Sequence, residues 1–266
     1  MKFYGRITMP MSDARWTKDA HVPFDAVILC GGLGTRLQSV LGDVPKPMAP
    51  VAGRPFLERL LMKLQRSSCT HVVLCAGPNL QCMWKYCQDG ERWGLHIEYA
   101  KEPERLGTGG ALRCALPHLR TDPVAVLNGD TWCDVDLCTM VRWHGWRGAR
   151  CTIALTAAPD ADRYGSVRRT PEGAITQFAE KRGRGEAGWI NAGVYVIAQE
   201  VIRSIPSDRP VSLECEIFPQ WVGRGLYGYD GVRQFLDIGT PESYRQATRW
   251  FPEPFAVSDG GPRGME

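Results

Sequence analysis

The sequence predicts an α/β fold of the doubly wound type, with a mostly parallel sheet followed by a β-rich second half. Between residues 25 and 128, short apolar runs alternate with segments whose apolar residues recur at helical spacing. This βαβα order is typical of a parallel sheet with helices on both faces. After residue 150 a long apolar run and a pair of short runs replace the alternation, which indicates antiparallel strands.

The elements of the first half follow in order. Strands are expected at 25–30, 71–76, 95–100 and 123–128. The first expected helix has Pro55 at its first helical position and carries leucines and a phenylalanine at helical spacing, at positions 56, 57, 60, 61 and 64. Further helices are expected at 79–88, at 108–119 and from about Leu137. Ligands of an open α/β sheet bind outside the carboxyl ends of the strands, so the residues after 30 and 128 are expected at the binding edge.

The second half is expected to begin with a long strand at 151–158. Two short runs, 166–169 and 174–180, are joined by Thr170-Pro171-Glu172-Gly173 and predict a hairpin. Another strand is expected at 189–197. A closing helix is expected at 241–251, with Thr240 as its N-cap and Pro241 at its first position.

Composition limits the domain count and the partners. The chain has 266 residues, of which 44% are hydrophobic and 23% charged, as expected for one large globular domain. We expect a polar N-terminal extension over 1–24, one domain over 25–251, and a flexible tail over 252–266. A formal net charge of +3 with scattered arginines does not indicate a nucleic-acid partner. There is no apolar signal segment and no run long enough to cross a bilayer, so no membrane partner is expected.

The ten cysteines do not indicate disulfides or zinc. No Cys-x-x-Cys occurs, and the five histidines are isolated along the sequence, which gives a zinc site little support. Cys30, Cys75 and Cys151 lie in apolar runs, where cysteine acts as a small hydrophobic residue. We therefore expect reduced thiols in a cytoplasmic protein.

The most informative motif directly follows the first strand. Gly31-Gly32-Leu33-Gly34-Thr35-Arg36-Leu37, closed by Pro45-Lys46-Pro47, combines a glycine-rich turn with two cations. Glycines allow close approach of the backbone, successive N–H groups form an anion-binding concavity, and Arg36 and Lys46 add positive charge. No Lys-Ser or Lys-Thr follows, which excludes a P-loop, and Leu37 breaks a dinucleotide fingerprint. The motif predicts a polyphosphate site.

Two carboxylates follow expected strands. Asp130 comes after Leu127-Asn128-Gly129, and Asp237 after Arg233-Gln234-Phe235-Leu236. Each alone could be a turn former. Beside a polyphosphate loop they predict a Mg²⁺ site, because Mg²⁺ takes oxygen ligands from one or two carboxylates and substrate phosphates. Asp134 and Asp136 are nearby alternative candidates for metal ligands, but we assign them to the cap of the helix starting near Leu137.

The polyphosphate motif resembles the signature of the sugar-1-phosphate nucleotidyltransferases, the nucleotide-diphosphosugar pyrophosphorylases, and the similarity extends from about Asp25 to Trp250. Within this family, three strings look most like bacterial D-glycero-α-D-manno-heptose 1-phosphate guanylyltransferases. They are Val44-Pro45-Lys46-Pro47-Met48-Ala49-Pro50-Val51, Leu127-Asn128-Gly129-Asp130-Thr131 and Ile190-Asn191-Ala192-Gly193-Val194-Tyr195. The resemblance implies a Rossmann-like nucleotidyltransferase fold, GTP or another NTP and a sugar 1-phosphate as substrates, and Mg²⁺. Whether the chain forms a homo-oligomer is left open by the resemblance.

The resemblance also implies roles for individual residues. The implied catalytic residues are Arg36, Lys46, Asp130 and Asp237, the last two as metal ligands. The implied nucleotide-binding residues are Gly31, Gly32, Leu33, Gly34, Thr35, Glu102, Gly107 and Thr108, with Glu102 at the position that reads the base edge. The implied sugar-phosphate-binding residues are Gly165, Glu180, Lys181 and Asn191.

Several of these residues could instead have purely structural roles. Glu102 could be a surface carboxylate, Glu180-Lys181 an exposed ion pair, and Leu106-Gly107-Thr108-Gly109-Gly110 a tight turn alone. At the level of the whole chain, three alternatives remain. They are a mannose- or glucose-1-phosphate nucleotidyltransferase, a non-catalytic paralogue that binds nucleotide sugars, and an oxidoreductase. The broken dinucleotide fingerprint argues against the last.

Overall fold

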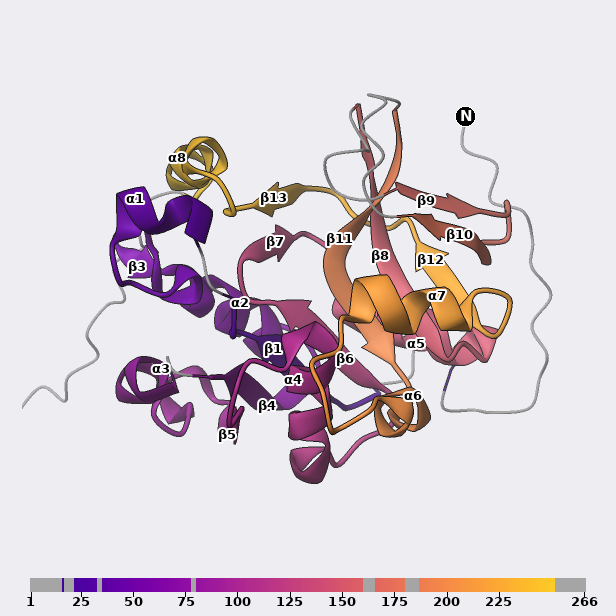
Figure 1. The fold of residues 1–266 in the computed structure, drawn as a ribbon, viewed down its shortest axis with the longest axis horizontal. Coiled ribbons are helices and arrows are strands. Elements are labelled where there is room, and N and C mark those ends of the chain that lie inside the picture. The colour runs from indigo at the N-terminus through magenta and orange to yellow at the C-terminus, as the bar shows by residue number, and fades with distance from the viewer. Residues whose placement is uncertain are drawn as a thin grey trace, which may run out of the picture.

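The structure is a computed structural model that describes residues 16, 22–32, 35–77, 80–159, 166–179 and 187–251. Within these residues the main sheet has nine strands, in the order β10-β9-β11-β6-β1-β4-β5, with β8 and β12 continuing from β11 (Figure 1). Its parallel half consists of β6 (Val124–Asn128), β1 (Phe24–Leu29), β4 (Cys69–Ala76) and β5 (His96–Lys101). The fold is therefore α/β with a central parallel sheet, as predicted.

The other half of the sheet is largely antiparallel. The long strand β11 (Gly188–Ile197) pairs antiparallel with β6, with β8 (Cys151–Ala158) and with β9 (Ser166–Arg169). The predicted hairpin is present, because β9 pairs antiparallel with β10 (Ile175–Ala179). β12 (Leu226–Tyr229) adds a parallel pair with β8. This half forms the predicted β-rich part of the molecule.

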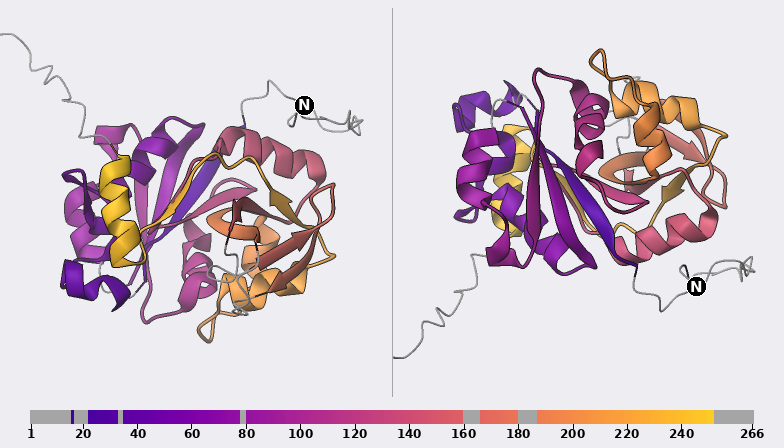
Figure 2. Two further views of the ribbon diagram at one scale, coloured as in Figure 1. Left: turned by 90° about the horizontal axis from the view of Figure 1, so that it is seen from above. Right: turned by 90° about the horizontal axis from the view of Figure 1, so that it is seen from below.

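Helices cover both faces of the sheet, as Figure 2 shows most directly. β1 is buried along its whole length, so its alternate residues serve two cores. Ala26 and Ile28 pack into the core that also holds leucines of α2, whereas Val27 and Leu29 pack into the core that holds residues of α4. The helices are α1 (Gln38–Leu41), α2 (Phe56–Gln65), α3 (Leu80–Cys87), α4 (Gly107–Ala115), α5 (Leu137–Arg147), α6 (Gln199–Ser204), α7 (Phe218–Trp221) and α8 (Pro241–Trp250).

Two predicted helix caps are confirmed. Asp136 is the N-cap of α5, and its side chain accepts a hydrogen bond of 3.0 Å from the Thr139 amide. Thr240 begins α8 with a capping box shared with Ser243, and Pro241 stands at the first position. Both helices start where the sequence placed them because capping depends on local contacts.

Three predicted boundaries are wrong. Pro55 is the N-cap of α2 rather than its first residue, because it pairs in the short ribbon of β2 (Pro50–Val51) and β3 (Arg54–Pro55). The helix expected at 108–119 ends at Ala115 and continues as a 3₁₀ turn over Leu116–His118. Pro117 has no N–H for an α-helical bond, so the last turn changes type. β4 starts two residues earlier than expected.

A second, smaller ribbon crosses the carboxyl ends of the parallel strands (Figure 1). β7 (Thr131–Cys133) follows β6 after a two-residue turn and pairs antiparallel with β13 (Phe235–Asp237). The tail predicted at 252–266, and the predicted extension at 1–24 apart from Trp16 and residues 22–24, lie outside the described residues.

The predicted chemical character of three cysteines is confirmed, since Cys30, Cys75 and Cys151 are all buried. All ten cysteines are free thiols. None of the helices in the described ranges is both long enough and apolar enough to cross a membrane.

Candidate active site

The glycine-rich segment after β1 lies against Glu102. A Cβ atom on Gly31 would lie 2.7 Å from Oε1 of Glu102, so a larger residue here would displace the end of the Glu102 side chain. Gly32 follows, and Thr35 begins a 3₁₀ turn that includes Arg36. The predicted residues Leu33 and Gly34 lie outside the described residues.

A pocket of about 240 Å³ opens beside this turn. It is lined by Leu29, Gly31, Gly32, Glu102, Arg105, Gly107, Thr108 and Ala111. Five of the predicted nucleotide-binding residues therefore lie around one cavity, at the carboxyl ends of β1 and β5. Gly107 has a φ of +71°, and a Cβ there would lie 2.6 Å from the Val211 carbonyl oxygen, so the second glycine turn is also a close backbone approach.

Glu102 is the buried charged group of this pocket, with 6% of its surface exposed. Its Oε2 accepts a long hydrogen bond of 3.4 Å from the Leu106 amide, whereas Oε1 has no hydrogen-bond partner among the described residues. Burial raises the pKa of this carboxyl above its ordinary value. An unpaired buried acceptor is costly, and a ligand that donates a hydrogen bond here would remove that cost.

The two predicted metal carboxylates are brought together by the ribbon of β7 and β13. Thr131 pairs with Asp237, and the Ile238 amide donates a 3.0 Å hydrogen bond to the Asp130 carbonyl. Burial raises the pKa of Asp237, and the neighbouring charge of Asp130 raises it further. Residues more than 100 positions apart in sequence thus form a pair of like charges.

The two predicted cations, Lys46 and Arg36, interact electrostatically with this pair of carboxylates. Lys46 Nζ donates to Asp130 Oδ2 over 2.9 Å, with only 11% of the lysine side chain exposed. The charges of Lys46 and of the exposed Arg36 lower the pKa of Asp237, against the larger effects of burial and of Asp130. Arg36, Lys46, Asp130 and Asp237 therefore belong to one electrostatic cluster.

The carboxylate pair suits a hard cation. Its side-chain ligand atoms are oxygens only, and burial, followed by the neighbouring charge of Asp130, raises the pKa of Asp237. Mg²⁺ prefers such oxygen ligands and keeps positions open for phosphates. Burial raises the pKa of the nearby Cys30 thiol, and the charges of Asp130 and Glu102 add to this effect.

The predicted sugar-phosphate residues are only partly described. Gly165, Glu180 and Lys181 lie outside the described residues. Asn191 lies on β11, where its Nδ2 donates to the Tyr195 hydroxyl over 2.9 Å and its Oδ1 accepts from the Gly193 amide over 2.9 Å. Both ends of the Asn191 side chain are thus held in place.

Glu214 links Asn191 to the nucleotide pocket. The Tyr195 hydroxyl donates to Glu214 Oε1 over 3.2 Å, and the Thr108 hydroxyl donates to Glu214 Oε2 over 2.7 Å. Thr108 also accepts from the Leu213 amide over 2.9 Å. The Thr108 hydroxyl is therefore engaged within the protein, where it connects α4 to Leu213 and Glu214, and Thr108 also lines the pocket.

Sequence reasoning missed Glu214 and Arg105. Glu214 lies in a π-helical turn, Leu213–Ile217, that has no glycine or periodic signal. Arg105 precedes the predicted turn at 106–110 and lines the pocket without belonging to a motif. Only the contact of distant segments identifies them.

Known proteins are similar to this chain over nearly its full length. The family described as nucleotidyl transferase matches residues 25–252. A mannose-1-phosphate guanylyltransferase of Mycobacterium tuberculosis is 38% identical over 223 residues, 83% of this chain, but this chain spans only 62% of that relative. A D-glycero-alpha-D-manno-heptose 1-phosphate guanylyltransferase of Campylobacter jejuni is 35% identical over 82% of this chain and 96% of its own length.

Solved structures show the same relationship. HddC from Yersinia pseudotuberculosis superposes with a TM-score of 0.76 and 31% identity, over 86% of this chain and all of that one. The same protein complexed with GMP-PN gives a TM-score of 0.75 and 32% identity over the same shares. This chain belongs to the nucleotidyl transferase family.

Proposed function

We propose that this protein joins an NTP and a sugar 1-phosphate into an NDP-sugar with release of pyrophosphate. The most specific form of the proposal is GTP and D-glycero-α-D-manno-heptose 1-phosphate giving GDP-heptose. The observation that carries it is the cluster of Asp130, Asp237, Lys46 and Arg36 beside the pocket that holds Glu102. The two cations would neutralise the negative charge of the phosphates, and the pocket would hold the base.

In the proposed reaction an oxygen of the sugar phosphate attacks the α-phosphorus, and the bond from that phosphorus to the β-phosphate bridging oxygen breaks. Phosphate monoesters lose their second proton near pH ~6, so the nucleophile is already ionised and needs no general base. The task of the protein is to position the groups and neutralise their charge.

The charged side chains divide this task. Lys46, held at Asp130, would meet the α-phosphate, and Arg36 with the glycine-turn amides would hold the leaving phosphates. Asp130 and Asp237 would hold Mg²⁺, which would supply further positive charge to the phosphates. Lys181, outside the described residues, is proposed to hold the incoming phosphate.

Guanine is the proposed base because of the chemistry of Glu102. Guanine presents two donors on its pairing edge, and an ionised carboxylate offers only acceptors. Glu102 lies in the pocket with an unpaired Oε1 that such a donor would satisfy. The relatives named for guanylyl transfer support the same base.

The observations identify the base more specifically than they identify the sugar. The relative spanned almost completely by this chain is named for heptose 1-phosphate, and a relative with 38% identity is named for mannose 1-phosphate. Mannose 1-phosphate is therefore the second candidate. A non-catalytic paralogue is disfavoured because Arg36, Lys46, Asp130 and Asp237 are all present and clustered.

The test is a matrix of four NTPs against heptose, mannose and glucose 1-phosphates, with pyrophosphate release as the readout. We expect the highest kcat/KM for GTP with heptose 1-phosphate. A preference for mannose 1-phosphate would change the sugar and keep the base. A preference for a pyrimidine nucleotide would remove the guanylyl assignment, and no turnover with any pair would support the regulatory alternative.

A further inference from the structure

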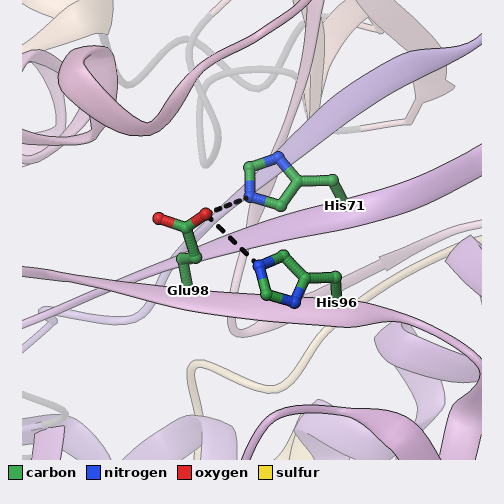
Figure 3. A group of neighbouring side chains, drawn as sticks. All are labelled: His71, His96 and Glu98. Atoms are coloured by element: carbon green, nitrogen blue, oxygen red, sulfur yellow. Dashed lines mark hydrogen bonds and ion pairs between the residues drawn. The ribbon is translucent and has the colours of Figure 1, made fainter.

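A cluster of histidines and carboxylates lies at the edge of the sheet opposite the candidate active site. His71 on β4 pairs directly with His96 on the neighbouring strand β5, and Glu98 follows two residues later on the same face. Glu98 Oε1 lies 3.2 Å from His71 Nε2 and 3.4 Å from His96 Nε2 (Figure 3). The histidines are isolated along the sequence, but the strand register brings two of them together in space.

Two of the separations between donor atoms of these three residues match those around a tetrahedral metal. Two zinc–nitrogen bonds of ~2.0–2.1 Å at the tetrahedral angle separate their ligand atoms by roughly 3.3–3.4 Å. The separations of 3.2 and 3.4 Å at Glu98 Oε1 match this value. All three donor atoms lie within 4.8 Å of one another, and the two imidazole rings stack with centroids 5.4 Å apart.

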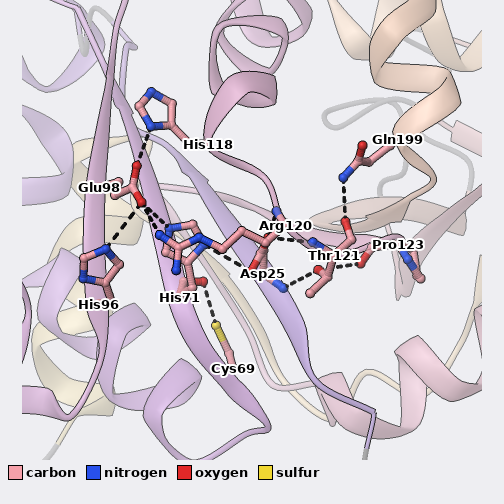
Figure 4. A network of polar contacts seen from close by, with 10 residues as sticks. All are labelled: Asp25, Cys69, His71, His96, Glu98, His118, Arg120, Thr121, Pro123 and Gln199. Atoms are coloured by element: carbon pink, nitrogen blue, oxygen red, sulfur yellow. Dashed lines mark hydrogen bonds and ion pairs between the residues drawn. The ribbon is translucent and has the colours of Figure 1, made fainter.

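His71 has a carboxylate near each ring nitrogen. Asp25 Oδ1 lies 3.1 Å from Nδ1, and Glu98 Oε1 lies 3.2 Å from Nε2 (Figure 4). Asp25 is itself fixed, because its Oδ2 accepts from the amides of Arg120 and Thr121. A neutral imidazole carries one proton, so when Nδ1–H faces Asp25, the lone pair of Nε2 faces another acceptor. A cation at Nε2 removes the conflict. It would leave Nδ1, which has no hydrogen-bond partner among the described residues, to donate to the nearby Asp25 carboxylate, as in metal-binding histidines.

Two neighbours complete the cluster. His118 Nδ1 lies 2.6 Å from Glu98 Oε2, on the oxygen not shared by the other histidines. The guanidinium of Arg120 contacts Glu98 Oε1 and so occupies part of the space a metal would use. Its side chain is 57% exposed, which leaves it free to turn into solvent. A metal bound at Glu98 Oε1 would therefore displace the Arg120 guanidinium, and the two cannot occupy this place at once.

We propose that His71, His96 and Glu98 form a transition-metal site, with Zn²⁺ as its cation, separate from the Mg²⁺ site at Asp130 and Asp237. Imidazole nitrogens suit Zn²⁺, whereas the all-oxygen pair at the other edge suits Mg²⁺. The site joins the edge strand β5 to β4, so a metal that binds only the folded chain stabilises the sheet there. His96 is 55% exposed, which leaves a position open to solvent or a fourth ligand.

The experiment measures binding of Zn²⁺ and Co²⁺ to the EDTA-stripped, dialysed full chain in excess Mg²⁺, which fills the carboxylate pair. Calorimetry should give one equivalent of Zn²⁺ per chain. Co²⁺ should give a visible spectrum of nitrogen and oxygen ligands, without the ultraviolet charge transfer of thiolate ligands. A chain carrying Cys82→Ser and Cys215→Ser, which removes both exposed thiols, should bind identically.

Three variants test the site: two should weaken Zn²⁺ binding and one should strengthen it. Loss of a second-shell partner alone costs ~10–100-fold in metal affinity, so His96→Ala and Glu98→Gln should each lose at least about tenfold. His96 is exposed, so its removal leaves the fold intact, which circular dichroism checks. Arg120→Gln removes the competing guanidinium and should bind Zn²⁺ more tightly than wild type. None of the three changes should alter nucleotidyl transfer, because the cluster lies at the opposite edge of the sheet.

Several results would overturn the proposal. These are no saturable Zn²⁺ binding in the wild type, equal affinity in His96→Ala, or binding that disappears with the two cysteine changes. Unchanged affinity in Arg120→Gln together with weak wild-type binding would show instead that a proton, not a metal, is the cation shared by His71 and its two carboxylates.

Discussion

Asp237 is the residue whose surroundings give the clearest pH dependence. Burial, and then Asp130, raise its pKa, so the native chain binds more protons than the unfolded chain between the ordinary value, about 3.9, and the raised one. In that interval the free energy of unfolding of the metal-free protein should fall as pH rises. Mg²⁺ competes with the same proton, so half-saturating Mg²⁺ should fall as pH rises. Mg²⁺ titrations of activity from pH 5 to 8 measure this.

Asp237→Asn separates the two effects. The amide keeps an oxygen that can accept from the Gly239 amide but removes the charge that repels Asp130. The variant should lose turnover and yet melt at a higher temperature than metal-free wild type at neutral pH, by roughly 2–4 °C for each 1 kcal/mol gained. Calorimetric melting in EDTA tests this, and a lower melting temperature would contradict the like-charge account.

Lys46→Ala should cost catalysis much more than folding. Lys46 is the cation held at Asp130, and a cation on a transferring phosphoryl group contributes ~10³-fold or more in rate. We expect kcat to fall by at least that order while circular dichroism stays normal. Lys85→Ala, an exposed lysine on α3, is the matched control and should keep full activity. Near-normal turnover in Lys46→Ala would remove the lysine from the proposed mechanism.

Glu102→Gln should blunt the preference for GTP. The change replaces one acceptor with an N–H₂ donor facing the donors of guanine, and a mismatched buried pair costs ~1–3 kcal/mol. This corresponds to a loss of roughly 5–150-fold in kcat/KM for GTP. The same amide suits the donor between two acceptors of uracil, so UTP should gain relative to GTP. An unchanged ratio of the two kcat/KM values would mean that another group reads the base.

At the scale of elements, the π-helical turn at Leu213–Ile217 joins α4 to β11 through one carboxylate. Glu214 accepts hydrogen bonds from the hydroxyls of Thr108, Tyr195 and Ser212. These three donors come from separate elements, so Glu214 fixes the distance between the nucleotide pocket and Asn191. If Asn191 binds the sugar as proposed, Glu214 positions the two halves of the site relative to each other.

Glu214→Gln should therefore destabilise the protein and weaken both substrates together. The new N–H₂ group faces hydroxyl donors and leaves at least one of them unpaired, at a cost of ~1–3 kcal/mol. Melting should fall by roughly 2–4 °C per kcal/mol, and KM should rise for both substrates. Glu200→Gln, at an exposed ion pair with Arg150, is the control and should change stability by less than about 1 kcal/mol. A rise in only one KM would show that Glu214 does not couple the halves.

At the scale of the molecule, nucleotide and metal should stabilise the chain together. EDTA should stop turnover, and excess Mg²⁺ should restore it, if Asp130 and Asp237 hold the metal. With Mg²⁺ present, GTP at 100 times its Kd should add ~2.7 kcal/mol to the free energy of unfolding, read as a higher melting temperature. Asp130→Asn should lose the Mg²⁺-dependent part, whereas Asp208→Asn, an exposed position, should keep it. Turnover that persists in EDTA would contradict the metal proposal.

Local signals in the sequence were enough for most elements of this fold. The apolar runs predicted β1, β4, β5 and β6, and the run at 151–158 predicted β8 with its exact ends. The caps at Asp136 and Thr240 were predictable because an N-cap depends on contacts within three residues. The glycine-rich turn was also visible in the sequence, and Gly31 lies directly against the Glu102 side chain.

Tertiary structure decided which distant residues meet. Sequence alone could mark Asp130 and Asp237 as candidates, but the pairing of β7 with β13 puts them side by side. Burial, and then the charge of Asp130, raise the pKa of Asp237. Glu214 and the cluster of His71, His96 and Glu98 carried no readable signal. The reason is physical: capping and periodicity act over a few residues, whereas strand register and burial bring together side chains far apart in the chain. A titratable group acquires its chemistry from those neighbours.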